Sequence, residues 1–397
     1  MGFARSGTGN DWRVALEQAL AGAPRQGNDL VFLFASQHYS SDYWPMVANV
    51  VDQLGPRVLI GCSGQGVIST GVEVEEQPGL SVMALSLPGA ELHRVRLGKA
   101  DMDNLKTPAD WHARLGRPPA DVNAWVILSD PYSFDTDALI EGLTAAYPGV
   151  TVVGGMASGM AHMRGTHLFV DGQVYTDGAT LLAIGGGWTV HSVVSQGAQP
   201  IGETWTVTDA DRNMLKGIGG RPPLEVLVET MRALPEEMQQ RASRNLLVGL
   251  AMDEYKDEFG RGDFLIRNLL GADQTTGILA IGAFPRIGQT LQFQVRDAAA
   301  ADDELRAMLA QADGELGTVE PAGALLCSCN GRGRGLFREP HHDATAVNRQ
   351  FEGLPVAGFF CNGEIGPVGG KTFVHGFTAS IAFFVPVEGA STATAGS

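Results

Sequence analysis

The chain has 397 residues, of which 44% are hydrophobic and 18% are charged, and this composition suffices for large buried cores in two domains. Its formal net charge of −16 repels phosphate backbones and anionic lipid, so neither nucleic acid nor a membrane surface is an expected partner. With no secretory apolar stretch and only four cysteines, the sequence predicts a cytoplasmic protein.

Three stretches of the sequence share one order of parts: an apolar strand, a helix, and a second apolar strand that ends in a glycine-rich turn. In the first stretch the two strands end at Ser36 and Gly61. In the second they end at Ser129 and Gly154, with the same spacing of 25 residues. Residues 323–366 repeat this order with a longer first loop. The sequence therefore predicts three strand–helix–strand repeats.

Further strands follow each repeat. Residues 80–87 and 377–386 have apolar strand patterns, and an Asp-Gly turn at Asp171 and Gly172 predicts a hairpin after the second repeat. A strand–helix–strand unit makes a parallel pair, whereas hairpins add antiparallel strands. We therefore expect an α/β (α+β) fold in which repeated βαβ units form mixed β-sheets flanked by helices.

The pattern changes between about residues 196 and 320, where several short strands surround one or two helices. This change predicts a domain boundary near residue 196. The expected domains are residues 1–195, with two repeats, and residues 196–388, with an inserted α+β segment and the third repeat. Residues 389–397 contain nothing that can pack, and we expect a disordered tail there.

Several motifs together resemble those of the FIST proteins: "VLIGCSGQGVI", "SDPYSF", "VVGGMASG", "CSCNGRGRGLF" and "GFFCNGEIGPVGG". The resemblance runs from about residue 28 to about residue 387. It implies a FIST N-terminal domain in the first predicted domain and a FIST C-terminal domain in the second. It also implies a sensory module of signal transduction that binds small ligands such as amino acids, with no catalytic residue set.

Three glycine-rich turns, residues 61–66, 154–159 and 358–366, follow or end the second strands of the repeats. If the repeats pack symmetrically, we expect these turns to converge, and their N–H groups would cradle a ligand carboxylate. Alternatively, the glycines only permit tight turns and close packing. The predicted ligand-binding residues at the strand ends are Cys62, Ser63, Gly64, Asp130, Gly154, Gly155, Ser158, Asn330, Arg332, Gly333, Cys361, Asn362 and Glu364.

Arg332 is the residue expected to orient a carboxylate, because a guanidinium pairs with a carboxylate through two parallel hydrogen bonds. Asp130 or Glu364 would accept the ammonium group of an amino acid. Alternatively, Arg332 is exposed or pairs with Glu364 or Asp343, and Asp130 only forms a turn beside Pro131.

Two other classes of function stay open. Cys62 or Cys361, with His375 as the base, could carry thiol-dependent acyl or amide transfer or hydrolysis, although small buried cysteines also simply pack. The third class is a protein-interaction scaffold, as in the F-box branch of the FIST family.

Among these classes, we expect binding without catalysis. The expected partners are a small-molecule ligand and a downstream signalling protein. No cofactor is expected, and no metal either, because the C-x-C pair of Cys327 and Cys329 lacks the C-x-x-C spacing of zinc knuckles.

Overall fold

The computed structural model describes residues 2–160, 165–256, 259–260 and 262–387. These residues form two compact units. The first unit takes the described residues within 1–194, 307–374 and 379–397, and the second takes those within 195–306 and 375–378. All three repeats therefore lie in the first unit. The predicted domain bounds stay a prediction, and the predicted tail, residues 389–397, lies outside the described residues.

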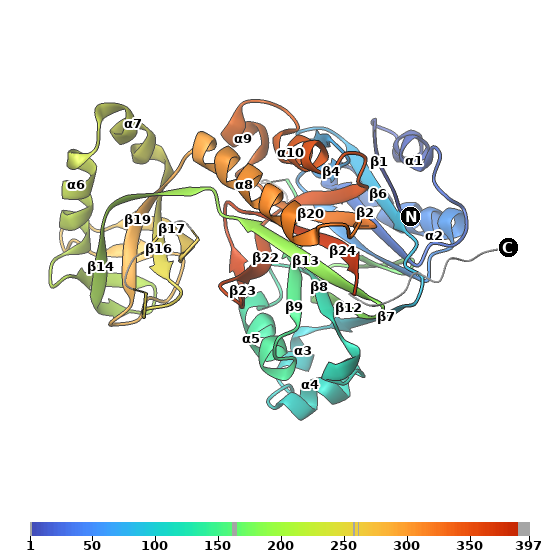
Figure 1. The fold of residues 1–397 in the computed structure, drawn as a ribbon, viewed down its shortest axis with the longest axis horizontal. Helices are drawn as coiled ribbons and strands as arrows, with labels where there is room; N and C mark the ends of the chain where they lie inside the picture. The colour runs from blue at the N-terminus through green and yellow to red at the C-terminus, as the bar shows by residue number, and fades with distance from the viewer. Residues whose placement is uncertain (1, 161–164, 257–258, 261, 388–397) are drawn as a thin grey trace. The chain divides into compact units, whose positions relative to one another are not determined.

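Each repeat forms a parallel strand pair joined through a helix, as the sequence predicted (Figure 1). The strands are almost entirely buried and rich in apolar residues, as parallel strands covered on both faces must be. The three units are β2 (Leu30–Ser36), α2 (Tyr43–Leu54) and β3 (Val58–Gly64); β8 (Ala124–Ser129), α5 (Thr136–Ala146) and β9 (Thr151–Met156); and β20 (Gly323–Cys329), α10 (His342–Gln350) and β21 (Val356–Cys361).

Each parallel pair is extended by strands that follow a different repeat. The hairpin of β10 (Leu168–Val170) and β11 (Gln173–Tyr175) follows the second repeat but pairs antiparallel with β3 of the first. β22 (Gly363–Val368) follows the third repeat and pairs with β9 of the second. β4 (Val67–Ser69), paired with β5 (Val72–Val74), follows the first repeat and joins β21 of the third. The exchange is therefore cyclic, and every sheet combines the parallel pair of one repeat with strands that follow another repeat.

Three mixed six-stranded sheets result, with the orders β1-β6-β2-β3-β10-β11, β23-β22-β9-β8-β12-β7 and β13-β24-β20-β21-β4-β5. Their other strands are β1 (Gly2–Thr8), β6 (Gly79–Leu85), β7 (Ala90–Leu97), β12 (Ala179–Gly186), β13 (Trp188–Ser195), β23 (Lys371–His375) and β24 (Ala379–Pro386). The remaining helices of the first unit are α1 (Trp12–Leu20), α3 (Lys99–Met102), α4 (Pro108–Leu115) and α9 (Gly333–Phe337), with short 3-10 turns η1 (Gln37–Asp42) and η2 (Pro119–Asp121). Helix α8 (Ala298–Leu316) is divided between the two units after Arg306.

The inner faces of the three sheets share one apolar core. Phe34 stacks on Phe359 with ring centroids 4.9 Å apart, and Phe32 packs on Phe384 with centroids 5.5 Å apart, so the first and third repeats touch directly. Val126 and Leu128 of the second repeat belong to the same cluster. Helices α1 and α2 cover the outer face of the first sheet, and α4 and α5 cover that of the second. The repeats therefore depend on one another for burial.

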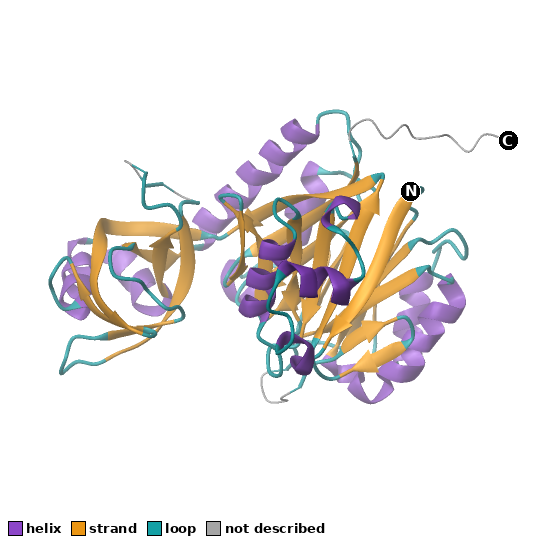
Figure 2. Ribbon diagram, turned by 90° about the horizontal axis from the view of Figure 1, so that it is seen from below, coloured by secondary structure: helices purple, strands orange, loops and turns teal. Residues whose placement is uncertain are grey.

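The second unit is a closed six-stranded β-barrel, which the sequence pattern did not predict (Figure 2). The expected short strands and helices are present. The sequence did not predict that the strands close into a barrel, because register shifts, as between Val207 and Asp209, interrupt the alternation of apolar and polar residues along them. The barrel order is β14-β15-β18-β17-β16-β19, formed by β14 (Ala198–Asp211), β15 (Met214–Ile218), β18 (Leu279–Ile281), β17 (Phe264–Ala272), β16 (Leu246–Ala251) and β19 (Thr290–Arg296), with α6 (Pro223–Ala233) and α7 (Glu236–Asn245) in the same unit.

The second strand of each repeat requires glycine at one matching position. A Cβ atom added at Gly358 would lie 1.8 Å from the carbonyl oxygen of Leu326, and the distances at Gly61 and Gly154 are 1.7 and 1.9 Å to the corresponding carbonyl oxygens. The paired strands therefore approach more closely here than any side chain allows.

We predict that Gly358→Ala lowers the free energy of unfolding by about 1–3 kcal/mol or more, because the strands must separate to admit the methyl group. Chemical denaturation of the full chain measures this change. Gly335→Ala is the control, since Gly335 is exposed in α9 with open space around its would-be Cβ, and it should change stability by less than about 1 kcal/mol. Equal effects of the two changes would contradict the close-approach argument.

Candidate functional site

The glycine-rich turns of the three repeats meet inside the first compact unit. The N–H of Ser158 donates to the carbonyl of Ser63 over 3.1 Å. The hydroxyl of Ser158 accepts from the N–H of Gln65 over 2.7 Å and donates to the carbonyl of Phe360. Ser158 therefore joins all three turns, which converge as the repeat pattern predicted.

This junction is filled by its own atoms. Ser63, Ser158 and Cys361 have 0% exposure. A Cβ atom at Gly64 would lie 2.5 Å from the carbonyl oxygen of Gly66, and the glycines of the other turns are similarly confined. Gly155, for example, lies against Cys327. Close packing, one of the two readings that the sequence left open, therefore accounts for these glycines, and their contact with a ligand stays a prediction.

Two asparagines form the accessible edge of the junction. Nδ2 of Asn330, just after β20, donates to Oδ1 of Asn362 over 2.8 Å. Nδ2 of Asn362 donates in turn to the carbonyl of Ala157 over 3.1 Å. Oδ1 of Asn330 is buried and has no hydrogen-bond partner within the described parts of the chain. Of the predicted ligand residues near the junction, Asn362 is exposed and Asn330 is half-buried.

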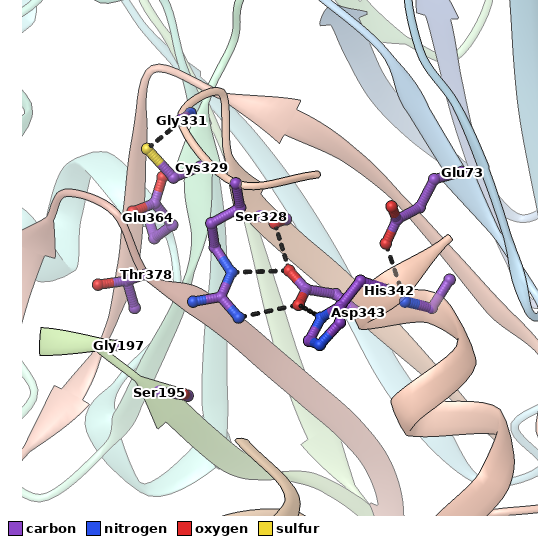
Figure 3. A network of polar contacts seen from close by, with 12 residues as sticks. Glu73, Ser195, Gly197, Ser328, Cys329, Gly331, His342, Asp343, Glu364 and Thr378 are labelled. Carbon is purple, nitrogen blue, oxygen red and sulfur yellow. Dashed lines mark hydrogen bonds and ion pairs between the residues drawn. The ribbon is translucent and has the colours of Figure 1, made fainter. Parts of the chain in front are cut away.

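Arg332 forms a buried ion pair with Asp343 (Figure 3). Nε and Nη2 of Arg332 each donate over 2.8 Å to one carboxylate oxygen of Asp343, and the two side chains are 0% and 1% exposed. Ser328 and His342 also contact this carboxylate, over 2.7 and 2.9 Å. Pairing with Asp343 is one of the alternatives that the sequence left open. Contact between Arg332 and a ligand stays a prediction, and the neighbouring Gly333 is buried at the start of α9.

Glu73 is a buried acid that the sequence analysis did not single out. It lies on β5, in the hairpin that the first repeat contributes to the third sheet, and it is 4% exposed. Its Oε1 accepts from the N–H of Ala344 over 3.0 Å, while Oε2 has no hydrogen-bond partner among the residues that the structure describes. Glu73 stands between Val72 and Val74 in a short strand, so no local pattern marks it as buried.

The two buried acids, Glu73 and Asp343, differ in their protonation state. Burial raises the pKa of Glu73 to about 8, and the charge of Asp343 raises it as well. Although burial alone would raise the pKa of Asp343, the Arg332 guanidinium and His342 hold that pKa well below its usual range. At neutral pH Asp343 is therefore ionised and Glu73 carries a proton.

Asp130, the first residue after β8, lies in a turn that borders a cavity. Its Oδ2 accepts from the N–H of Ser133 over 2.8 Å, and its Oδ1 accepts from the hydroxyl of Thr166 over 2.5 Å. The turn role that the sequence offered for Asp130 is therefore present. The loop after it lines a cavity of about 790 Å³, together with α3, α4 and α5. The cavity residues used below are Lys99, Asp103, Lys106, Trp111, Phe134, Asp135 and Gly142.

The thiols proposed for catalysis are poorly placed to ionise. Burial raises the pKa of both Cys62 and Cys361 well above the usual value. A thiol with a raised pKa is protonated at neutral pH and is a weak nucleophile. His375, the base in that alternative, is the last residue of β23 and is buried.

Glu364, which was predicted to accept an ammonium group, is fully buried and accepts from Sγ of Cys361 over 3.1 Å. Among the described residues, no group of three His, Cys, Asp or Glu side chains could hold a metal ion. None of the described helices is both long enough and apolar enough to cross a bilayer.

The comparison with known proteins identifies the family. Residues 29–221 match the FIST N domain and residues 223–367 match the FIST C domain. An uncharacterized protein of Mycobacterium tuberculosis (strain H37Rv) is 42% identical over 371 residues, which cover 94% of each chain. An uncharacterized protein of Mycobacterium bovis is 39% identical over 356 residues, or 90% of each chain. The chain therefore belongs to the FIST family, as its motifs predicted.

A solved structure of different sequence also matches over most of its length. The crystal structure of a cyanuric acid hydrolase from A. caulinodans covers 97% of this chain and 99% of its own, at 11% sequence identity and a TM-score of 0.37. A likeness this weak carries no conclusion about the fold or the chemistry of this chain.

The state of Glu73 generates a prediction for the pH dependence of stability. In the unfolded chain Glu73 ionises above about pH 4.5, whereas in the folded protein it keeps its proton up to about pH 8. Its contribution to stability is therefore complete below about pH 4.5 and is lost as the pH rises toward about 8, at up to roughly 1.4 kcal/mol per pH unit. The pKa of Asp343 is shifted in the opposite direction, so its contribution to stability is lost only as the pH falls below the range in which Glu73 titrates.

We expect Glu73→Gln to remove this decline, so that its free energy of unfolding falls less than that of the wild type between pH 5.5 and 8.5. Urea denaturation at intervals of one pH unit measures both slopes. A constant offset between the curves reflects the altered hydrogen bonding of the amide and leaves the slopes unaffected. Glu76→Gln, at an exposed position in the same segment, is the control. Parallel curves for wild type and Glu73→Gln would contradict the assignment.

Proposed function

We propose that this FIST protein is a non-catalytic sensory protein that binds a small carboxylate metabolite, of the amino-acid kind, in the cavity beside the second repeat. The observation that carries the proposal is the cavity of about 790 Å³ that borders the end of β8. Small-molecule sites in proteins usually enclose about 300–1,000 Å³, and in α/β sheets they lie beyond the carboxyl ends of the strands. The membership of the FIST family supports a sensory role.

The lining of the cavity contains the groups that an amino acid requires. Lys99 and Lys106 supply two ammonium groups for a carboxylate, and Asp103 and Asp135 supply carboxylates for an α-ammonium group. Asp135 is held in place because its Oδ1 caps α5 by accepting from the N–H of Ala138 over 3.0 Å. The charges of both signs favour a zwitterion over a simple anion.

The apolar part of the lining is built by one close contact. Trp111 is 3% exposed and lies against α5 where Gly142 stands. A Cβ atom at Gly142 would lie 2.2 Å from Cζ2 of Trp111, so only glycine lets the indole pack here. Phe134 is buried beside it. These rings would receive an apolar side chain of the ligand.

A chain of hydrogen bonds links the cavity loop to the junction of the three repeats. Asp130 accepts from Ser133 in the loop and from the hydroxyl of Thr166. The next residue, His167, exchanges two hydrogen bonds with Ser63: its N–H donates to the Ser63 hydroxyl over 3.0 Å, and its carbonyl accepts from the Ser63 N–H over 2.9 Å. Binding that reorders the loop would thus be transmitted to the junction, and a downstream signalling protein would read the change.

We predict that an amino acid or a related small carboxylate raises the melting temperature of the full chain and is recovered unchanged. At a hundred times the dissociation constant the stabilisation is about 2.7 kcal/mol. Differential scanning fluorimetry across the amino acids identifies the ligand, and isothermal titration gives its affinity.

The matched variants locate the site. Lys106→Ala should lower the affinity for the ligand at least about tenfold, the effect of losing one charged hydrogen bond. Lys216→Ala in the barrel should leave the affinity unchanged. Conversion of the ligand to a product would favour the enzymatic alternative. Absence of any stabilising carboxylate would refute the proposal, and an unchanged affinity in Lys106→Ala would exclude this cavity as the site.

A further inference from the structure

The ends of β20 and β21 carry a pair of cysteines that the proposed ligand site does not use. Cys329 is the last residue of β20, Cys361 is the last residue of β21, and the two are register partners in the parallel pair. Neighbouring strands lie about 4.8 Å apart, which is within the range of Cα separations that a disulfide spans. Register partners also direct their side chains to the same face of a sheet. The backbone therefore places the two residues side by side, with their side chains on the same face of the sheet.

Cys329 has the surroundings of an attacking thiol. It is partly exposed, whereas the other three cysteines of the chain are buried. The backbone N–H of Gly331 donates to its Sγ over 3.4 Å (Figure 3). A donated hydrogen bond stabilises a thiolate more than a thiol, and thiolate character together with access to solvent determines which cysteine is oxidised first.

Cys361 has the surroundings of a resolving thiol. It is fully buried, and its S–H donates to Oε1 of Glu364 over 3.1 Å, with the carbonyl of Ser328 also within 3.3 Å. Burial raises the pKa of the Cys361 thiol, and the charges of Glu364, Cys327 and Cys329 raise it further. Glu364 is the group positioned to take the proton of Cys361.

We propose that Cys329 and Cys361 form a redox-sensitive dithiol that a hydroperoxide oxidises to a disulfide. In the first step the thiolate of Cys329 attacks the terminal oxygen of the hydroperoxide. A sulfur–oxygen bond forms, the oxygen–oxygen bond breaks, and the departing alkoxide takes a proton to become an alcohol. The sulfur is oxidised to a sulfenic acid and the peroxide is reduced.

In the second step the sulfur of Cys361 attacks the sulfenic sulfur of Cys329. The proton of Cys361 passes to Glu364, the sulfur–sulfur bond forms, and the sulfur–oxygen bond breaks. The departing hydroxide takes that proton and leaves as water. Two thiols and one hydroperoxide thus give one disulfide, one alcohol and one water.

The other two cysteines serve as internal controls. Cys62 and Cys327 are both fully buried, and burial raises the pKa of each thiol. In the sheet, Cys327 is the register partner of Phe359 rather than of a cysteine. Neither thiol has both the exposure and the partner that the two steps require.

The first test is a map of the oxidised thiols in the wild-type protein. The reduced full chain is treated with a small excess of hydrogen peroxide, alkylated under denaturing conditions and digested. We expect a peptide pair joined between Cys329 and Cys361, with Cys62 and Cys327 recovered as alkylated thiols. Peroxide that leaves all four thiols alkylated, under conditions that oxidise the dithiol of a reference peptide, would overturn the proposal, as would a disulfide between any other pair.

The variants separate the two steps. In Cys361→Ser the sulfenic acid on Cys329 has no resolving partner, so dimedone should label Cys329. The rate at which peroxide consumes free thiols should be at least about tenfold lower in Cys329→Ser than in Cys62→Ser. Glu364→Gln should leave the dimedone reaction intact in the Cys361→Ser background and slow disulfide formation at least about tenfold with Cys361 present. Lack of dimedone labelling would overturn the assignment of Cys329.

Circular dichroism shows whether each variant is folded. The map of the wild-type protein decides the pairing even if a variant is not. The proposal does not depend on the ligand cavity, which lies at the second repeat.

Discussion

The structure of the first unit depends on the exchange of hairpins between its repeats. No repeat completes its own sheet, because the strands that extend β3, β9 and β21 each come from another repeat. The exchange brings the three strand ends together, and the close approach of backbones there requires glycine at Gly61, Gly154 and Gly358. Hydrogen bonds from Ser158 to two other turns then fix the junction. Buried polar groups of this kind are costly unless they are paired, so the junction also fixes the arrangement of the repeats.

The repeat itself could be predicted from the sequence because its information is local. Short segments of the sequence suffice to recognise the spacing of 25 residues, the apolar strands and the Asp-Gly hairpin. All of these features are present in the structure. The partners of the hairpins could not be predicted, since nothing in Val67–Ser69 indicates that it pairs with a strand in the third repeat. The closed barrel was missed for a related reason, because bulges break the alternation that would mark its strands.

The candidate site shows the same division between features that local sequence predicts and features that depend on long-range contacts. The convergence of the turns followed from the repeat, whereas the state of each side chain depends on long-range contacts. The sequence around Arg332 is compatible both with a contact to a ligand and with an ion pair to Asp343. The position of α10, which carries Asp343, determines that Arg332 forms the ion pair. Glu73 is buried by that same helix. The cavity is lined by α3 and α4, in a segment that no sequence motif marks.

The matching positions of the repeats carry different chemistry on one backbone plan. Three residues after the close-approach glycines stand Gly64, Ala157 and Cys361. Among these three residues, only Cys361 can react with an oxidant, whereas the loop of the second repeat opens onto a cavity of about 790 Å³. A repeated scaffold can thus hold separate sites, because each site uses loops and side chains that the common core does not need.

The cyclic exchange also has a consequence for biosynthesis. The β4–β5 hairpin leaves the ribosome early, but the strand that it pairs with, β21, is made only after the whole barrel. Contacts so distant in sequence form slowly, and an unpaired strand edge invites wrong partners in the meantime. A nascent chain of this protein therefore holds an open sheet edge until the third repeat has been synthesised.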